Sequence, residues 1–342
     1  MCTMSNGRFR YRRLYIILYA ATAAAAFSPG VTHVSAQAPG ARAPAYHAPR
    51  TGWGAPDLHG DYTNKDEANT PLERPRQLAG KEATTFSEAD LAKLARERSD
   101  AARQIAGGIG GAETGAGPTH WYDHLAARGS RPWFITDPPD GQLPAMTPQA
   151  QRREAAIALL NDARNGEGRA DSTDDRSMYD RCITRGLPGS MMPAIYGNAY
   201  QIVQTPDAIA IRYEMIHETR IIPLDGRPHA AARLHLLMGD ARGRFDGDTL
   251  VVETTNFTNR THFGYNNRYN SEKLKLVERF TPIAPGKLNW AVTVNDAEVW
   301  TQPWTFAMTL TRDESQQVFE YACHEGNYGL LHILSGARSE DR

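Results

Sequence analysis

The sequence predicts a mainly β protein whose C-terminal part, residues 196–342, folds into an antiparallel β-barrel. From Tyr200 onward, apolar and polar residues alternate with a period of two, which is the pattern of half-buried strands. Turn-forming pairs such as Asp225-Gly226 and Pro285-Gly286 separate these runs, and strands joined by such short turns are antiparallel. Eight or nine strands must close or stack to hide their edges. A meandering, lipocalin-like barrel meets this need, and a β-sandwich is the alternative.

The expected strands follow one another with short connections in most places. A polar and aromatic gap at residues 258–271 is long enough to form a rim loop over a pocket. The runs that we interpret as strands are 200–204, 208–215, 217–224, 241–245, 249–257, 273–282, 287–296, 304–312 and 316–323.

Residues 37–195 are expected to wrap around or cap the barrel rather than fold alone. They are rich in polar residues, proline and glycine, and their apolar periodicity is too weak for a separate sheet. Two helices are predicted among them. The first begins after Ser87, in a segment that resembles a capping box, and continues to about Ile105. The second begins at Thr147-Pro148, where an N-cap residue precedes a proline suited to the first helical position.

The first 36 residues are interpreted as a removable secretory signal. Four arginines precede an apolar run at residues 14–27, and Val34-Ser35-Ala36 supplies the small residues that signal peptidase prefers. The run is shorter than the ~20 apolar residues that a membrane span needs, so we expect no span in the mature chain. Removing the four arginines changes the formal net charge from −1 to −5, and the chain has no basic tract that predicts nucleic acid as a partner. We expect a periplasmic or extracellular protein.

Two of the three cysteines remain after the signal is removed. In an oxidising compartment, Cys182 and Cys323 are expected to form one disulfide. It would close a loop of roughly 140 residues and contribute on the order of 4–5 kcal/mol in the chain-entropy model. Two buried free thiols and a thiol nucleophile are the alternatives, although neither cysteine lies in a recognisable activated setting.

Several motifs resemble a large family of secreted bacterial proteins. They include RCITRGLPGSM from residue 181, HETRIIPLDGRPH from residue 217, GRFDGDTLVVETTNF from residue 243 and EYACHEGN from residue 320. Together with similar stretches near the N-terminus, the resemblance covers nearly all of the mature chain. It implies one integrated exported unit, and no activity or catalytic residue is carried over from it.

Four polar side chains are expected to face the barrel interior. Alternate residues of a strand point to the same side, so a polar residue that shares the parity of its apolar neighbours points inward. His217, Asn256, Glu278 and Asp296 have this parity. A buried carboxylate beside a histidine has a shifted pKa, which suits acid–base chemistry near neutral pH. We therefore predict His217 as the catalytic base or acid, with Glu278 and Asp296 as its carboxylate partners.

Each predicted catalytic residue also has a purely structural interpretation. Glu278 could form an ion pair with an arginine such as Arg220 or Arg212. Asp296 could cap a turn before Trp300, and His217 could be a hydrogen-bonded core histidine.

Six residues are candidates for binding substrate. Asn256 and Arg220 would hold negative charge that develops on the substrate. The aromatic candidates could stack on a sugar or aromatic ring, although aromatic residues of strands are also common in cores. His324 would lie at the barrel rim, where a solvated strand end is the alternative. The full set is Tyr213, Arg220, Asn256, Trp290, Trp304 and His324.

These residues favour an exported enzyme that performs acid–base chemistry in a barrel pocket. It would be a lyase or hydrolase without an organic cofactor, acting on a small or oligomeric substrate such as a glycoside. No metal site is predicted, because the histidines do not fall in a close ligand pattern such as His-x-x-x-His. A ligand-binding barrel that carries an apolar or sugar-like molecule is the alternative, and an envelope interaction module without a pocket is the third possibility. Convergence of His217, Glu278 and Asp296 in an accessible cavity would favour the enzyme.

Overall fold

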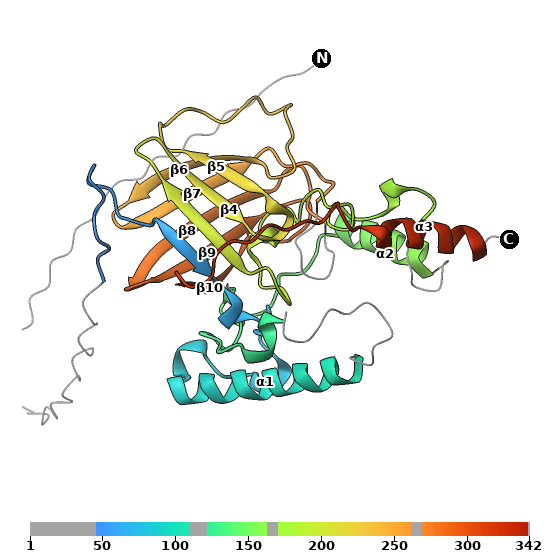
Figure 1. Cartoon of the computed structure of the whole chain (residues 1–342), viewed down its shortest axis with the longest axis horizontal. Helices are drawn as coiled ribbons and strands as arrows, with labels where there is room; N and C mark the ends of the chain where they lie inside the picture. Colours follow the sequence, from blue (N-terminus) through green and yellow to red (C-terminus); the bar gives the residue numbers. More distant parts are fainter. Residues whose placement is uncertain (1–45, 110–121, 163–169, 262–268, 341–342) are drawn as a thin grey trace, which may run out of the picture. The chain divides into compact units, whose positions relative to one another are not determined.

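A computed structural model describes residues 46–109, 122–162, 170–261 and 269–340 (Figure 1). The predicted secretory signal, residues 1–36, lies outside these ranges. Within them, none of the helices is both long enough and apolar enough to cross a membrane.

The described strands form one antiparallel sheet that closes almost completely into a barrel (Figure 1). Its order is β5-β4-β3-β1-β10-β9-β8-β7-β6, and β2 pairs with β10 beside this path. The two terminal strands, β5 and β6, lie against each other. The predicted antiparallel barrel is therefore confirmed. The strands are β1 Gly60–Thr63, β2 Ile135–Asp137, β3 Ala199–Gln204, β4 Ala208–Tyr213, β5 Thr219–Pro223, β6 Asp240–Asp246, β7 Thr249–Thr255, β8 Lys275–Ala284, β9 Lys287–Asn295 and β10 Trp304–Arg312.

Large side chains fill the barrel interior. Strands β8 and β9 alternate buried and more exposed residues as predicted, because every second side chain points inward. Trp290 is fully buried, with its ring centroid 6.3 Å from that of Phe280 and 5.5 Å from that of Phe306. Aromatic pairs at these separations pack at normal core density, so this part of the barrel is a core rather than a channel.

One strand of the barrel comes from the segment that was expected only to wrap around it. β1 lies between β3 and β10, with Tyr62 opposite Tyr200 on one side and Arg312 on the other. Four residues are too few to show a period of two in the sequence, so the strand is defined by its neighbours. The barrel therefore begins at Gly60, well before residue 196.

The strand predicted at residues 316–323 is wrong. This segment has no regular secondary structure, although its residues alternate as a strand would. Both edges of the preceding strand are already occupied, since β10 pairs with β9 on one side and with β1 and β2 on the other. The alternating pattern therefore finds no adjacent edge to extend.

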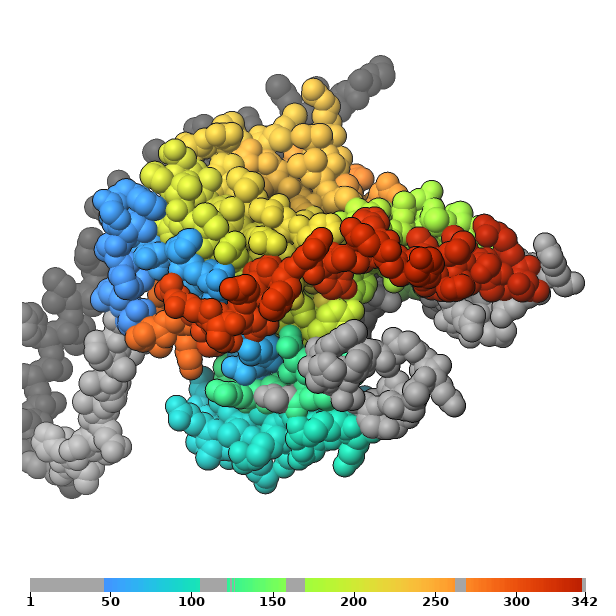
Figure 2. Space-filling view, viewed as in Figure 1, coloured from blue at the N-terminus to red at the C-terminus, as the bar shows by residue number. Residues whose placement is uncertain are grey.

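The same C-terminal segment crosses the outside of the barrel before it ends in a helix that we did not predict. Asp313 N donates to Asp61 O at 2.9 Å, and Lys65 Nζ lies 2.8 Å from Gln316 Oε1. The segment then reaches α3 (Tyr328–Glu340), and it forms a ridge over the barrel in the space-filling view (Figure 2).

Both predicted helices are present. α1 (Glu88–Ile109) begins after Ser87, whose Oγ accepts from Asp90 N at 3.2 Å while Ser87 N donates to the Asp90 carboxylate at 3.0 Å. These reciprocal bonds satisfy two backbone groups at the helix start, as a capping box does. α2 (Pro148–Asp162) begins after Thr147, whose Oγ1 accepts from Ala150 N at 3.2 Å.

A buried acid, Glu67, lies in the segment after β1. The Glu67 side chain is 1% exposed, and its carboxylate accepts from Ser130 N at 3.1 Å. Burial raises the pKa of Glu67, while hydrogen bonds from Ser130 and Thr309 and the charge of Arg131 offset part of the rise. The folded protein therefore holds this proton more tightly than the unfolded chain does.

We expect Glu67→Gln to stabilise the protein at neutral pH but not in acid. A raised folded-state pKa gives stability that is complete below the ordinary pKa of 4.5 and is lost as pH rises through the folded-state pKa. Glutamine cannot ionise, so the variant should lose this decline. Urea unfolding at about pH 4 and about pH 7 measures the difference, with Glu314→Gln, an exposed acid, as the control. Parallel pH profiles for wild type and Glu67→Gln would contradict the assignment.

Candidate functional site

A buried ion pair crosses the barrel interior. Arg220 on β5 donates to Glu278 on β8 through both terminal nitrogens, with Nη1–Oε1 at 3.1 Å and Nη2–Oε2 at 2.5 Å. The two side chains are 3% and 0% exposed. Strands β5 and β8 are not neighbours in the sheet, so this bidentate contact connects opposite parts of the barrel wall.

Polar groups from other strands complete this cluster. Thr254 Oγ1 accepts from Arg220 Nη2 at 3.3 Å, and Trp290 Nε1 donates to Glu278 Oε1 at 3.2 Å. Burial favours loss of the Arg220 charge, but the Glu278 carboxylate and Tyr213 outweigh it and raise the pKa of Arg220 above its ordinary value. For Tyr213, an acid, burial has the opposite effect and raises the pKa. Arg220 thus stays charged, and both oxygens of Glu278 are occupied. Glu278 therefore has the structural role given as its alternative, an ion pair with an arginine.

Asp296 lies at the end of β9 and has a different set of partners. Its carboxylate accepts from Ser271 N at 2.7 Å, from Ser271 Oγ at 2.6 Å and from Glu298 N at 3.3 Å. Its backbone oxygen accepts from Trp300 N at 2.8 Å. The residue therefore caps the turn before Trp300. Glu278 pairs with Val292, four residues before Asp296, which corresponds to about 13 Å along the strand.

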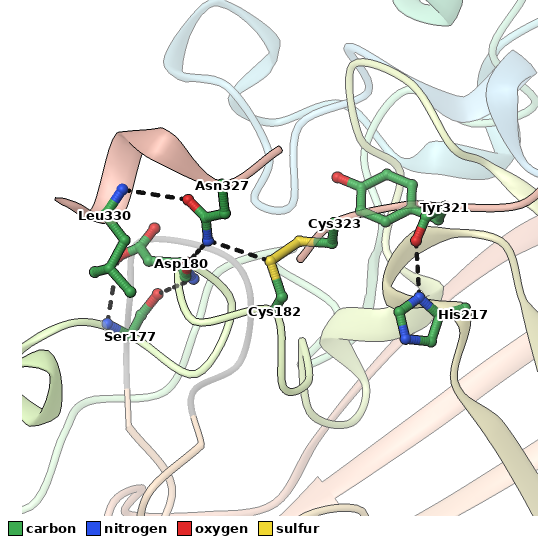
Figure 3. The surroundings of a disulfide bond; sticks show 8 residues. All are labelled: Ser177, Asp180, Cys182, His217, Tyr321, Cys323, Asn327 and Leu330. Carbon is green, nitrogen blue, oxygen red and sulfur yellow. Dashed lines mark hydrogen bonds between the residues drawn. A yellow bond between two sulfur atoms is a disulfide. The ribbon is translucent and has the colours of Figure 1, made fainter. Parts of the chain in front are cut away.

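His217 does not face the interior, so that prediction is wrong. Its side chain is exposed, and its Nδ1 lies 2.8 Å from the Tyr321 carbonyl oxygen (Figure 3). The parity counted from β4 fails because Ile216 and His217 have φ values of 64° and 47°, which turn the chain before β5. His217, Glu278 and Asp296 consequently have separate partners and do not converge.

The remaining candidates for binding substrate divide between the core and the rim. Tyr213, Trp290 and Trp304 are buried among core side chains, so for these three residues the alternative of a core position holds. Asn256 has φ 59° and donates through Nδ2 to the carbonyl oxygens of residues 230 and 231, at 3.2 and 3.1 Å. His324 is exposed.

The predicted disulfide joins Cys182 and Cys323, whose Cα atoms are 5.7 Å apart (Figure 3). Asn327 supports the same junction, since its Nδ2 donates to Asp180 O at 3.0 Å and contacts Cys182 Sγ at 3.4 Å. The Oδ1 of Asn327 accepts from Leu330 N at 3.2 Å, which caps the start of α3. The disulfide therefore holds the C-terminal segment against the turn that ends at Cys182, and it is consistent with an oxidising compartment.

A surface pocket lies at the end of the barrel where β6 begins and β7 ends. Its volume is about 430 Å³, and we call it the rim pocket. Three irregular segments line it, and none of them showed a periodic pattern in the sequence. Only the expectation of a rim loop after residue 257 pointed to this region. The lining residues are Met178, Arg181, Ile183, His235, Leu236, Leu237, Thr258 and Arg260.

Backbone hydrogen bonds hold one wall of the rim pocket in place. Leu236 N donates to Asn256 O at 2.8 Å, and Thr258 N donates to Leu236 O at 3.0 Å. His235 Nδ1 lies 3.0 Å from Phe257 O. Because these bonds connect the segment before β6 to the end of β7, this wall is fixed to the barrel.

The part of the lining around Cys182 is held by the disulfide and by Thr184. Arg181 and Ile183 flank Cys182, and Thr184 Oγ1 donates to Glu218 Oε2 at 2.7 Å. The same hydroxyl contacts Met238 Sδ at 3.4 Å, which links it to the segment before β6. Burial raises the pKa of Glu218, although the bond from Thr184 offsets part of that rise.

No protein-family model and no curated protein matches this chain. Among residues 46–109, 122–162, 170–261 and 269–340, no three His, Cys, Asp or Glu side chains are grouped so that they could hold a metal ion. A second cavity, beside α2, measures about 40 Å³ and has room for little more than ordered water. The rim pocket is the larger of these two cavities and the better candidate for a small-molecule site.

Proposed function

We propose that the protein is an exported ligand-binding barrel that takes a small apolar molecule in its rim pocket. The volume of that pocket, about 430 Å³, carries the proposal, because pockets of roughly 300–1,000 Å³ hold metabolite-sized ligands. Apolar side chains form much of its lining, and two of them, Ile183 and Leu236, are each 38% exposed. Exposed apolar surface around a concavity gains free energy when a ligand removes it from water.

This proposal places the ligand at the barrel rim rather than inside the barrel. Core aromatic residues and the Arg220–Glu278 pair occupy the interior. The lipocalin-like interpretation therefore applies to the arrangement of the strands and not to a ligand cavity inside the barrel. The acid–base reaction expected from the sequence required His217, Glu278 and Asp296 at one site. Their separate environments leave that reaction without a converged group of residues. Location in the periplasm or outside the cell remains part of the proposal, and the disulfide supports it.

Binding of a neutral fluorescent probe tests the proposal. We expect purified protein to bind N-phenylnaphthylamine saturably, and Ile183→Asp to weaken binding by about tenfold or more, because a carboxylate in the apolar lining must lose water when the probe enters. Ile221→Asp is the matched control, since Ile221 is 57% exposed on β5 and does not line the pocket. Thermal unfolding of both variants confirms that they are folded.

Two outcomes of this titration would overturn the proposal. One is a wild-type protein that shows no saturable binding of the probe. The other is equal binding by wild type and Ile183→Asp, which would place the probe elsewhere.

A further inference from the structure

We infer that the ligand of the rim pocket is an amphiphile with one anionic group, such as a long-chain carboxylate, and that Arg181 and Arg260 bind this group. The inference rests on the proposed function and specifies the chemical class of the ligand.

The charged side chains that line the pocket have one sign in the described part of the chain, while two acids lie next to the lining, Asp174 2.9 Å from Arg181 and Glu272 3.9 Å from His235. The lining contains Arg181, Arg260 and His235, and none of the eight lining residues is acidic. The whole chain, in contrast, carries 38 Lys and Arg against 39 Asp and Glu. A concave site with cationic side chains and apolar walls attracts an anion more strongly than the average surface of such a chain does.

Arg260 is free to bind a ligand. Its side chain is exposed, and it forms no ion pair with any residue in the described part of the chain. Its backbone is held near the pocket, because Arg260 N donates to Thr258 Oγ1 at 3.2 Å. The backbone of Arg260 is therefore anchored, and its guanidinium group has no ion-pair partner among the described residues.

Arg181 is held in place and keeps donors available. Its Nη1 donates to Asp174 at 2.9 Å, and the Asp174 side chain is 73% exposed. The Arg181 side chain is 20% exposed, so water weakens this ion pair chiefly from the Asp174 side. The planar guanidinium has five N–H donors, so a carboxylate can bind its remaining donors while Asp174 holds one nitrogen.

The apolar part of the lining determines the rest of the ligand. Met178 and Ile183 lie on either side of Arg181 in the chain, and Leu236 and Leu237 face the same space from the segment before β6. An inorganic anion would leave these apolar side chains in water, and a hydrocarbon would leave the arginines without an anion. A molecule with an apolar chain and one carboxylate satisfies both parts of the pocket.

Three probes with the same ten-carbon chain test the inference by displacement of N-phenylnaphthylamine: decanoate, decanol and decyltrimethylammonium, each below its micelle concentration. We expect decanoate to bind at least about fivefold more tightly than decanol, and the cationic probe to bind most weakly. Arg260→Gln should reduce the preference for decanoate over decanol. Arg244→Gln is the matched control, since Arg244 is exposed on β6 and does not line the pocket; it should leave the preference unchanged.

The failure of this inference and the failure of the proposed function give different results. Equal binding of decanoate and decanol, with both lost in Ile183→Asp, would overturn the role of the arginines and leave an apolar site. Binding of none of the three probes would overturn the proposed function as well. A decanoate preference that survives Arg260→Gln and Arg181→Gln together would also contradict the inference, because the charge would then come from other residues.

Discussion

Replacing Glu278 with glutamine is expected to lower the free energy of unfolding by about 3–5 kcal/mol. Glutamine has nearly the same size as glutamate, so the interior stays filled and the loss is electrostatic. It leaves the buried Arg220 guanidinium, whose pKa Glu278 raises, without the carboxylate that offsets its burial. Urea unfolding followed by tryptophan fluorescence measures the change, and Trp290, which donates to Glu278, reports from the site itself.

Two controls separate this effect from a general effect of charge removal. Arg279 is next to Glu278 on β8, and Arg279→Gln breaks its exposed pair with Asp246 of β6, which should cost no more than about 1 kcal/mol. The double variant Arg220→Met with Glu278→Leu removes both buried charges, so it should recover most of the stability lost in Glu278→Gln. A Glu278→Gln variant that unfolds at the same urea concentration as wild type would show that the pair does not stabilise the barrel.

The barrel could be predicted because its signal is local and repeated. In β8 and β9 each inward position is large and apolar except Glu278, so the period of two identifies both the strands and the polar residue that faces inward. An ion pair of Glu278 with Arg220 or Arg212 was the structural alternative for this acid, and the structure contains the pair with Arg220. Parity depends on an unbroken strand, and it failed at His217, where two residues with positive φ turn the chain.

The rim pocket could not be predicted from the same patterns. Its lining comes from residues 178–183, 235–237 and 258–260. These segments are far apart in the chain, and none of them is part of a helix or strand. Their proximity depends on barrel closure and on contacts such as that between Leu236 and Asn256. Such contacts join backbone groups, which are the same in every residue except proline, so the residue types do not predict them. Strand β1 escaped prediction for a related reason, since its four residues are paired by β3 and β10.

Removal of the disulfide is expected to lower the free energy of unfolding by about 4–5 kcal/mol, because Cys182 and Cys323 are 141 residues apart and the bond restricts the unfolded chain over that whole distance. It should also weaken probe binding, since Arg181 and Ile183 flank Cys182 and lose the bond that holds their turn against the C-terminal segment. Urea unfolding and probe titration, each with and without dithiothreitol, measure both effects. The variant Cys182→Ser with Cys323→Ser should match the reduced wild type and should not respond to dithiothreitol. If reduction lowers stability but leaves binding intact, the pocket wall is held by Thr184 and its partners alone. If reduction changes neither stability nor binding, the disulfide has no part in the stability of the barrel.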